Sequence, residues 1–410
     1  MFSYVPPAAS SDGEWEWAAS CEASGFDEAK LDEAVAFAIK HEVPWQKDLK
    51  TQLEHDNHFE SPPHNAVLGH LLERGGPSGM IIRGGKVVKT WGDVDRPDVA
   101  FSCSKSVLGT LYGIAFDDPE CPLNAATMVR PVCELLKYEK EFNDSARHKL
   151  ITWEHLLTQT SEWEGSLFDK SERIDRNRSV GAATANKHEQ TSRDFMHGFK
   201  DEELCLKGDF RELCEPGEHF EYNDVRVNLA ALALLQLTQT PAPELLRDGL
   251  FDRIGASSSW AWHGYGEHSL VTAGGEEVES VSGGAHWGGG LHASTSDLAR
   301  FGLLLARRGQ WGGEQLLSQE WIERMTLPSE RNPNYGYLWW LNTGGEFLPE
   351  AAEHTYFAAG AGGNCIAIDA KNDLVVVWRW LDNGRDDAHK RALWQKMMDA
   401  VTFSYSDINV

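Results

Sequence analysis

The sequence has few basic residues, and it lacks long apolar runs. Of its 410 residues, 38 are Lys or Arg and 63 are Asp or Glu, so the formal net charge is −25. This charge repels phosphate backbones and anionic headgroups, and no basic cluster reverses it locally, so we expect no nucleic-acid or membrane partner. The longest apolar stretch, around residues 229–237, is far too short to span a bilayer.

Two further absences concern the cellular compartment. The seven cysteines are widely scattered, odd in number and free of any C-x-x-C pair, so they are predicted to be reduced thiols. The amino-terminal segment has neither a basic region nor an apolar stretch of the kind found in secretory signals. We therefore expect an unexported, cytoplasmic protein.

The hydrophobic content is sufficient for a large core. Residues of hydrophobic type make up 41% of the chain, with 16 Trp and 17 Phe among them. Disorder is thereby excluded for most of the sequence, and the length allows one large domain or two interleaved ones.

Hydrophobic patterns at the two ends of the chain predict one sheet flanked by helices. Residues 79–91 contain two β-rich runs joined by two glycines, and residues 364–381 repeat that pattern around a turn-forming segment. Helical periodicity begins at Asp27, with one apolar face, and a second helix is expected after residue 388. The apolar face of the first helix is predicted to comprise Leu31, Ala34, Val35 and Ile39.

The middle of the chain is mostly helical in pattern. It includes a segment that Thr152 could cap and an almost wholly apolar helix after residue 224. We predict an α/β (α+β) fold, with an antiparallel sheet flanked by terminal helices and an inserted α-rich domain. The predicted divisions are an extension at 1–26, an α/β domain at 27–117 plus 273–410, and an inserted domain at 118–272.

A candidate nucleophile lies in the motif S-x-x-K at Ser102 to Lys105. A helical run follows, and residues three apart share a helix face, so hydroxyl and amine can meet. A serine hydroxyl needs a neighbouring base, and a lysine is a base only when it is neutral. Burial and the positive end of a helix dipole both favour that neutral form.

Further segments follow this motif in a fixed order. They are residues 151–161 (ITWEHLLTQTS), 216–224 (PGEHFEYND), 288–301 (GGGLHASTSDLARF) and 357–363 (FAAGAGG). Over about residues 79–381 the sequence therefore resembles the serine β-lactamase-like hydrolase superfamily of class C β-lactamases, family VIII carboxylesterases and 6-aminohexanoate-dimer hydrolases. The resemblance implies a β-lactamase/transpeptidase-like fold.

The resemblance also implies roles for individual residues. Ser102 matches the acylated serine, and Lys105 matches the lysine that shares its proton. Tyr222 matches the tyrosine that acts with this lysine as base toward the serine and as acid toward the leaving group. Backbone N–H groups of Ser102 and Ala361 are expected to form the oxyanion hole, beside Gly360 of the third motif.

Two positions depart from the family pattern. The second motif is usually Tyr-x-Asn, whereas here Asp224 stands two residues after Tyr222 and Asn223 lies between them. Either residue could orient Lys105, or could cap the helix that begins near Val225. The third motif carries no cation, because Ala358 stands where β-lactamases have a lysine.

Other residue groups have simpler interpretations. His263, His268, His286 and His292 match no metal-binding spacing, so no metal is expected. The glycine-rich segments 283–284 and 288–290 are predicted to let backbone approach a substrate. Aromatic residues near these motifs suit an apolar ligand, although core packing explains many of them. The predicted substrate-binding residues are Asn223, Asp224, His286, Trp287, Trp339 and Gly360.

These observations predict a serine hydrolase that cleaves an ester or amide bond of a small molecule through an acyl-enzyme, with no cofactor. The alternatives are acyl transfer from the same intermediate, a β-lactamase, and a catalytically inactive binding protein. The presence of Ser102, Lys105 and Tyr222 together disfavours the last alternative.

Overall fold

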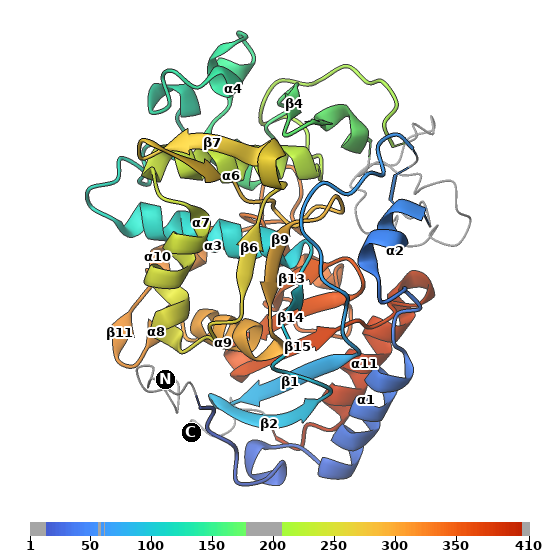
Figure 1. The fold of residues 1–410 in the computed structure, drawn as a ribbon. Helices are drawn as coiled ribbons and strands as arrows, with labels where there is room; N and C mark the ends of the chain where they lie inside the picture. The colour runs from blue at the N-terminus through green and yellow to red at the C-terminus, as the bar shows by residue number, and fades with distance from the viewer. Residues whose placement is uncertain (1–13, 56–58, 61, 178–206, 404–410) are drawn as a thin grey trace.

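A six-stranded antiparallel sheet forms the centre of one half of the molecule. The computed structural model describes residues 14–55, 59–60, 62–177 and 207–403. The strand order is β12-β13-β14-β15-β1-β2, so both ends of the chain contribute to the same sheet (Figure 1). The strands are β1 (Ser78–Arg83), β2 (Lys86–Trp91), β12 (Trp340–Leu341), β13 (Tyr356–Gly360), β14 (Asn364–Asp369) and β15 (Leu374–Arg379).

Helices cover both faces of this sheet. On one face, Gly302 of α9 (Thr295–Ala306) packs directly against Val375 and Ile366. On the other face, Trp394 of α11 (Ala388–Asp399) contacts Trp378 and Phe357. Residues that face α9 alternate along the strands with residues that face α11, because successive side chains of a β-strand point to opposite faces of the sheet. Helix α1 (Glu28–Lys40) lies beside α11 (Figure 1).

The remaining elements surround helix α3 (Cys103–Asp117), which is almost entirely buried. A second sheet of order β3-β9-β6 leads into this helix. Its strands are β3 (Asp98–Val99), β6 (Ala261–His263) and β9 (Gly290–Ala293). The other helices are α2 (Leu49–His55), α4 (Lys140–Asn143), α5 (Trp153–Leu157), α6 (Asp224–Thr238), α7 (Ala242–Leu246), α8 (Asp252–Ile254) and α10 (Gln319–Met325). Short hairpins are formed by β4 (Ser166–Leu167) with β5 (Lys170–Ser171), β7 (Leu270–Ala273) with β8 (Glu276–Glu279), and β10 (Gln310–Trp311) with β11 (Glu314–Gln315).

The predicted fold class is confirmed, and both predicted hairpins occur at the predicted places. Thr152 caps α5, and its hydroxyl accepts a hydrogen bond from the His155 N–H. One detail of α1 was wrong, since Ile39 is 48% exposed and Ala38 takes its place in the core. The predicted boundary at residue 272 falls inside strand β7, so the division into domains stays a prediction.

Two predictions about the compartment can be compared with part of the structure. No helix among the described residues is both long enough and apolar enough to cross a membrane. Six of the seven cysteines lie in the described residues and all six are free thiols, whereas Cys205 lies outside them.

Candidate active site

Ser102 lies where strand β3 turns into helix α3. Phe101, directly before it, has a φ of 46°, a left-handed conformation that costs a non-glycine residue about 1–3 kcal/mol. Gly284 supports this turn, because a Cβ there would lie 1.8 Å from the Phe101 carbonyl oxygen. Gly284 therefore lets backbone approach the Ser102 turn. That the glycines at 283–284 let backbone approach a substrate stays a prediction.

Lys105 is 1% exposed, and its Nζ lies 2.8 Å from the Ser102 hydroxyl oxygen. The i,i+3 spacing on α3 thus brings the two groups together, as the sequence predicts. The same Nζ lies 2.8 Å from Oδ1 of Asp224, which is 2% exposed. This lysine therefore contacts both the candidate nucleophile and a buried carboxylate.

Asn223 and Asp224 have different roles. The Asn223 side chain caps helix α6 by accepting from the Arg226 N–H, and its amide donates to the Glu172 carbonyl at 2.8 Å. It is fully buried, and its contact with substrate stays a prediction. Asp224 is the residue of this pair that contacts Lys105, which settles the alternatives left open by the sequence.

Tyr222 packs beside the lysine. The Lys105 Nζ lies 5.2 Å from the centre of the Tyr222 ring, which stacks on Trp340 at 5.4 Å. The sequence favoured Trp339 for the site; that residue is fully buried against Phe301 and Tyr356, and its contact with substrate stays a prediction. Adjacent residues of an extended segment point to opposite sides, and only Trp340 points toward Tyr222.

The end of strand β13 lies against the start of α3. A Cβ at Gly360 would lie 2.3 Å from the Ala100 carbonyl oxygen and 3.3 Å from the Cys103 backbone nitrogen. Only glycine allows this approach. Ala361 follows, is half-buried, and packs against the apolar cluster that contains Phe101.

Apolar side chains pack around Ala361. Phe101 and Trp380 are buried here, and the half-buried rings of Trp45 and Phe59 pack against them together with Ala361. Neither Trp45 nor Phe59 was selected from the sequence, because both lie in a stretch without a motif.

His286 lies behind the site, between two carboxylates. Its Nδ1 is 3.2 Å from Asp224 Oδ2, and its Nε2 is 2.8 Å from Glu60 Oε1. The imidazole is 5% exposed and stacks on Phe59. Trp287 is fully buried and donates from its indole to the His64 carbonyl at 2.9 Å. Buried polar contacts therefore hold His286 and Trp287 in place, and their contact with substrate stays a prediction.

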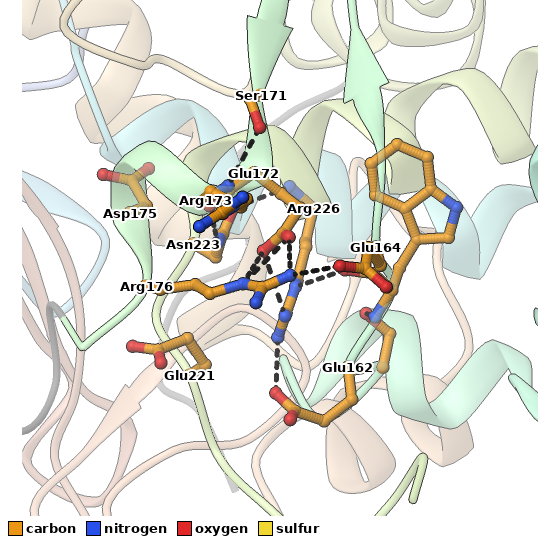
Figure 2. A network of polar contacts seen from close by, with 12 residues as sticks. Glu162, Glu164, Ser171, Glu172, Arg173, Asp175, Arg176, Glu221, Asn223 and Arg226 are labelled. Carbon is orange, nitrogen blue, oxygen red and sulfur yellow. Dashed lines mark hydrogen bonds and ion pairs between the residues drawn. The ribbon is translucent and has the colours of Figure 1, made fainter. Parts of the chain in front are cut away.

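A larger ion network lies beside the Tyr222–Asp224 segment (Figure 2). Arg226 of α6 donates to Glu162 at 2.7 Å and to Glu172 at 3.2 Å. Arg176 pairs with Glu172 and with Glu164. The guanidinium groups of Arg211 and Arg226 outweigh the burial of Glu162 and lower the pKa of its carboxyl to about 2.

The histidines do not form one group. His268 pairs with Asp169 at 2.6 Å, whereas His263 and His292 lie near His70. Burial, the largest cause, lowers the pKa of His292 to about 4.

One group in the described part of the chain has metal-ligand geometry. It consists of Glu60, Asp175 and His286, whose ligand atoms lie within 4.8 Å of one another. Lys207 already forms ion pairs with both carboxylates and supplies the positive charge. We therefore assign this group to an ion network.

Comparisons with known proteins identify the family and the fold. The model of the Beta-lactamase family matches residues 65–396. A curated protein of Escherichia coli O157:H7, described as "Putative D-alanyl-D-alanine carboxypeptidase", is 28% identical over 148 residues, or 35% of this chain and 32% of that protein. The chain thus matches about a third of that relative's length.

Two solved structures share the fold. A family VIII carboxylesterase superposes with a TM-score of 0.56 at 14% identity, covering 94% of this chain and 99% of that one. A structure from Bacteroides dorei DSM 17855, titled "putative beta-lactamase", gives a TM-score of 0.57 at 14% identity, covering 92% of this chain and 100% of that one. At these identities the likeness shows the fold alone.

Proposed function

The chain belongs to the beta-lactamase family, and from this membership we propose that it cleaves an ester or amide bond of a small molecule through an acyl-enzyme on Ser102. The observation that carries the proposal is the contact of 2.8 Å between the Ser102 hydroxyl and the buried Lys105 amine. A hydroxyl becomes a useful nucleophile only beside a group that can take its proton.

The proposed reaction has two halves. Ser102 Oγ attacks the carbonyl carbon while its proton passes to neutral Lys105, and the resulting oxyanion accepts hydrogen bonds from the N–H groups of Ser102 and Ala361. The proton then reaches the leaving alcohol or amine with the help of Tyr222, and the carbon–heteroatom bond breaks. Water attacks the acyl-enzyme and loses its proton to the same base, which releases the acid and restores Ser102.

The side chains around the proposed site favour a neutral, apolar substrate. Trp45, Phe59 and Trp340 provide aromatic surface near Ser102. Ala358 is fully buried in β13, and His286 and His354 are both paired with carboxylates. A β-lactam carboxylate would therefore lose hydration without gaining a partner from these groups.

This substrate preference is testable with p-nitrophenyl acetate or butyrate beside a chromogenic cephalosporin. We expect kcat/KM for the esters to exceed that for the cephalosporin by about a hundredfold or more, because each 1.4 kcal/mol of lost binding is a factor of ten. A cephalosporin turned over more efficiently than either ester would contradict the proposed substrate class.

A fluorophosphonate probe tests the proposed nucleophile. We expect wild-type protein to be labelled, and Ser102→Ala to be unlabelled and inactive while retaining its thermal midpoint. Ser106→Ala is the matched control, because Ser106 lies on the same helix and its buried hydroxyl only donates to the Leu338 carbonyl. Labelling of the Ser102 variant would assign the nucleophile to another residue, and an unlabelled wild type would favour a binding protein.

A further inference from the structure

The buried carboxylate of Asp224 poses a problem for the proposed base. Its Oδ1 lies 2.8 Å from Lys105 Nζ, and both side chains are about 2% exposed. A carboxylate at this distance favours the charged form of a lysine. The proposed reaction requires the neutral form. Some other group must therefore reduce the negative charge that Asp224 presents to Lys105.

His286 is placed to do this. Its two ring nitrogens face one carboxylate each, at 3.2 Å from Asp224 and 2.8 Å from Glu60. The Nε2 contact with Glu60 is a hydrogen bond, whereas the Nδ1 contact with Asp224 has an ion-pair distance without hydrogen-bond geometry. Only the imidazolium form presents a positive charge to both carboxylates. Stacking on Phe59 and contact with Trp287 fix the ring in this orientation.

The neighbouring charges support this assignment. Asp175 accepts from the Asp224 N–H at 2.8 Å, and Lys207 pairs with both Asp175 and Glu60. The carboxylates of Glu60, Asp175 and Asp224 thus face three cations, namely Lys105, Lys207 and protonated His286. Lys170 is the next cation outward, with its Nζ 5.0 Å from the Trp287 ring and hydrogen bonds to the His64 and Ala66 carbonyls.

We propose that His286 is a positioning residue of the site: held as a cation by Glu60, it balances the charge of Asp224 and so allows Lys105 to give up its proton. When Lys105 is neutral, the three carboxylates together with Lys207 and protonated His286 carry a net charge of minus one. If His286 were neutral as well, this net charge would be minus two. The inference rests on the proposed function, because it concerns the base of that reaction.

The pH dependence of kcat/KM for a p-nitrophenyl ester tests this role. His286→Gln removes the balancing charge, so we expect the acidic limb of the profile to move to higher pH by about one unit. At pH values on the acidic side of the limb, kcat/KM should then be roughly tenfold lower than in the wild type. Asp224→Asn removes the carboxylate, and its limb should move down. His286→Gln in the Asp224→Asn background should then have no further effect on the limb.

His286→Lys is the matched variant, since it keeps a cation beside Asp224 while changing the shape of the side chain. It should keep its limb closer to wild type than His286→Gln does. A role in packing alone predicts that both variants lose activity without moving the limb. That result, or an Asp224→Asn limb at the wild-type position, would overturn the inference.

The pH dependence of the fluorophosphonate labelling rate provides the second readout, because it requires only one reaction at Ser102. It also covers any variant whose ester turnover is too slow to measure. If labelling did not depend on Ser102, the proposed function itself would fail. If labelling depended on Ser102 but the His286 and Asp224 variants kept the wild-type pH profile, only the role of His286 would fail.

Discussion

Glu162 offers a direct test of how buried charge contributes to this fold. Its carboxylate is fully buried and accepts hydrogen bonds from Arg226 at 2.7 Å, from two Arg211 nitrogens at 2.6 Å, and from the Cys214 N–H at 3.0 Å. Burial alone would raise its pKa, but the two guanidinium groups outweigh burial and lower the pKa from 4.5 to about 2. The substitution Glu162→Gln removes the titrating group and keeps its shape.

The sign of the effect follows from this lowered pKa. The folded state holds the carboxylate more tightly ionised than the unfolded state does, so the stabilisation is complete above pH 4.5 and is lost as the pH falls toward 2. The shift corresponds to about 3 kcal/mol at neutral pH, and about 2 kcal/mol would remain near pH 3.5. The difference in the free energy of unfolding between wild type and Glu162→Gln should therefore shrink by more than about 1 kcal/mol between pH 7 and pH 3.5.

Urea denaturation followed by tryptophan fluorescence, at pH 7 and near pH 3.5, measures this difference. Glu164→Gln is the matched control, because Glu164 pairs with Arg176 in the same network but its side chain is 61% exposed. We expect Glu164→Gln to lower the free energy of unfolding by less than about 1 kcal/mol. If the difference in the free energy of unfolding between wild type and Glu162→Gln stayed constant with pH, Glu162 would not titrate differently in the folded state, and the prediction would be wrong.

Three further outcomes are expected. Tyr222→Phe should lower kcat by about 10²–10⁴-fold, because it removes a proton carrier, and steady-state ester hydrolysis checks this. Gly360→Val should lower both activity and the thermal midpoint, because its side chain would collide with the Ala100 carbonyl 2.3 Å from the Cβ position; circular dichroism and ester hydrolysis measure the two losses. Ester hydrolysis should survive EDTA, because every group in the proposed reaction is supplied by the chain; loss on chelation and recovery with zinc would contradict this.

Local patterns were sufficient for the elements that form the sheet. The hairpins at 79–91 and 364–381 combine β-branched runs with turn residues, and both occur as predicted. The pairing of β1 with β15 joins segments almost 300 residues apart, and only the flanking of the chain by similar hairpins suggested it. The error at Ile39 arose because several registers of an apolar face fit the same helix.

The site was predictable where its residues are close in sequence. Ser102 and Lys105 share one helix face, so their contact follows from spacing alone. Glu60 and Trp340 come from other segments, and they reach the site only through the way those segments pack. No motif marks either residue. Composition likewise cannot tell which of two adjacent tryptophans faces the core: Trp339 is fully buried, whereas Trp340 stacks on Tyr222.

The buried ion network beside the Tyr222–Asp224 segment raises the question of what it contributes. Replacing a buried ion pair by apolar residues is often neutral or stabilising, so stability alone does not explain a network of this size. Removing one partner, in contrast, leaves a buried charge without its counter-ion. Glu162, Glu172 and Arg226 therefore strongly disfavour other orientations of the segment.

This restriction matters because three consecutive residues of the segment point in different directions. Tyr222 packs on Trp340, Asn223 caps α6, and Asp224 reaches Lys105. A shift of one residue along the chain would exchange these positions and place a carboxylate or an amide where the tyrosine ring now lies. We interpret the network as fixing that register, so that the carboxylate at position 224 meets both the lysine and the histidine that balances it.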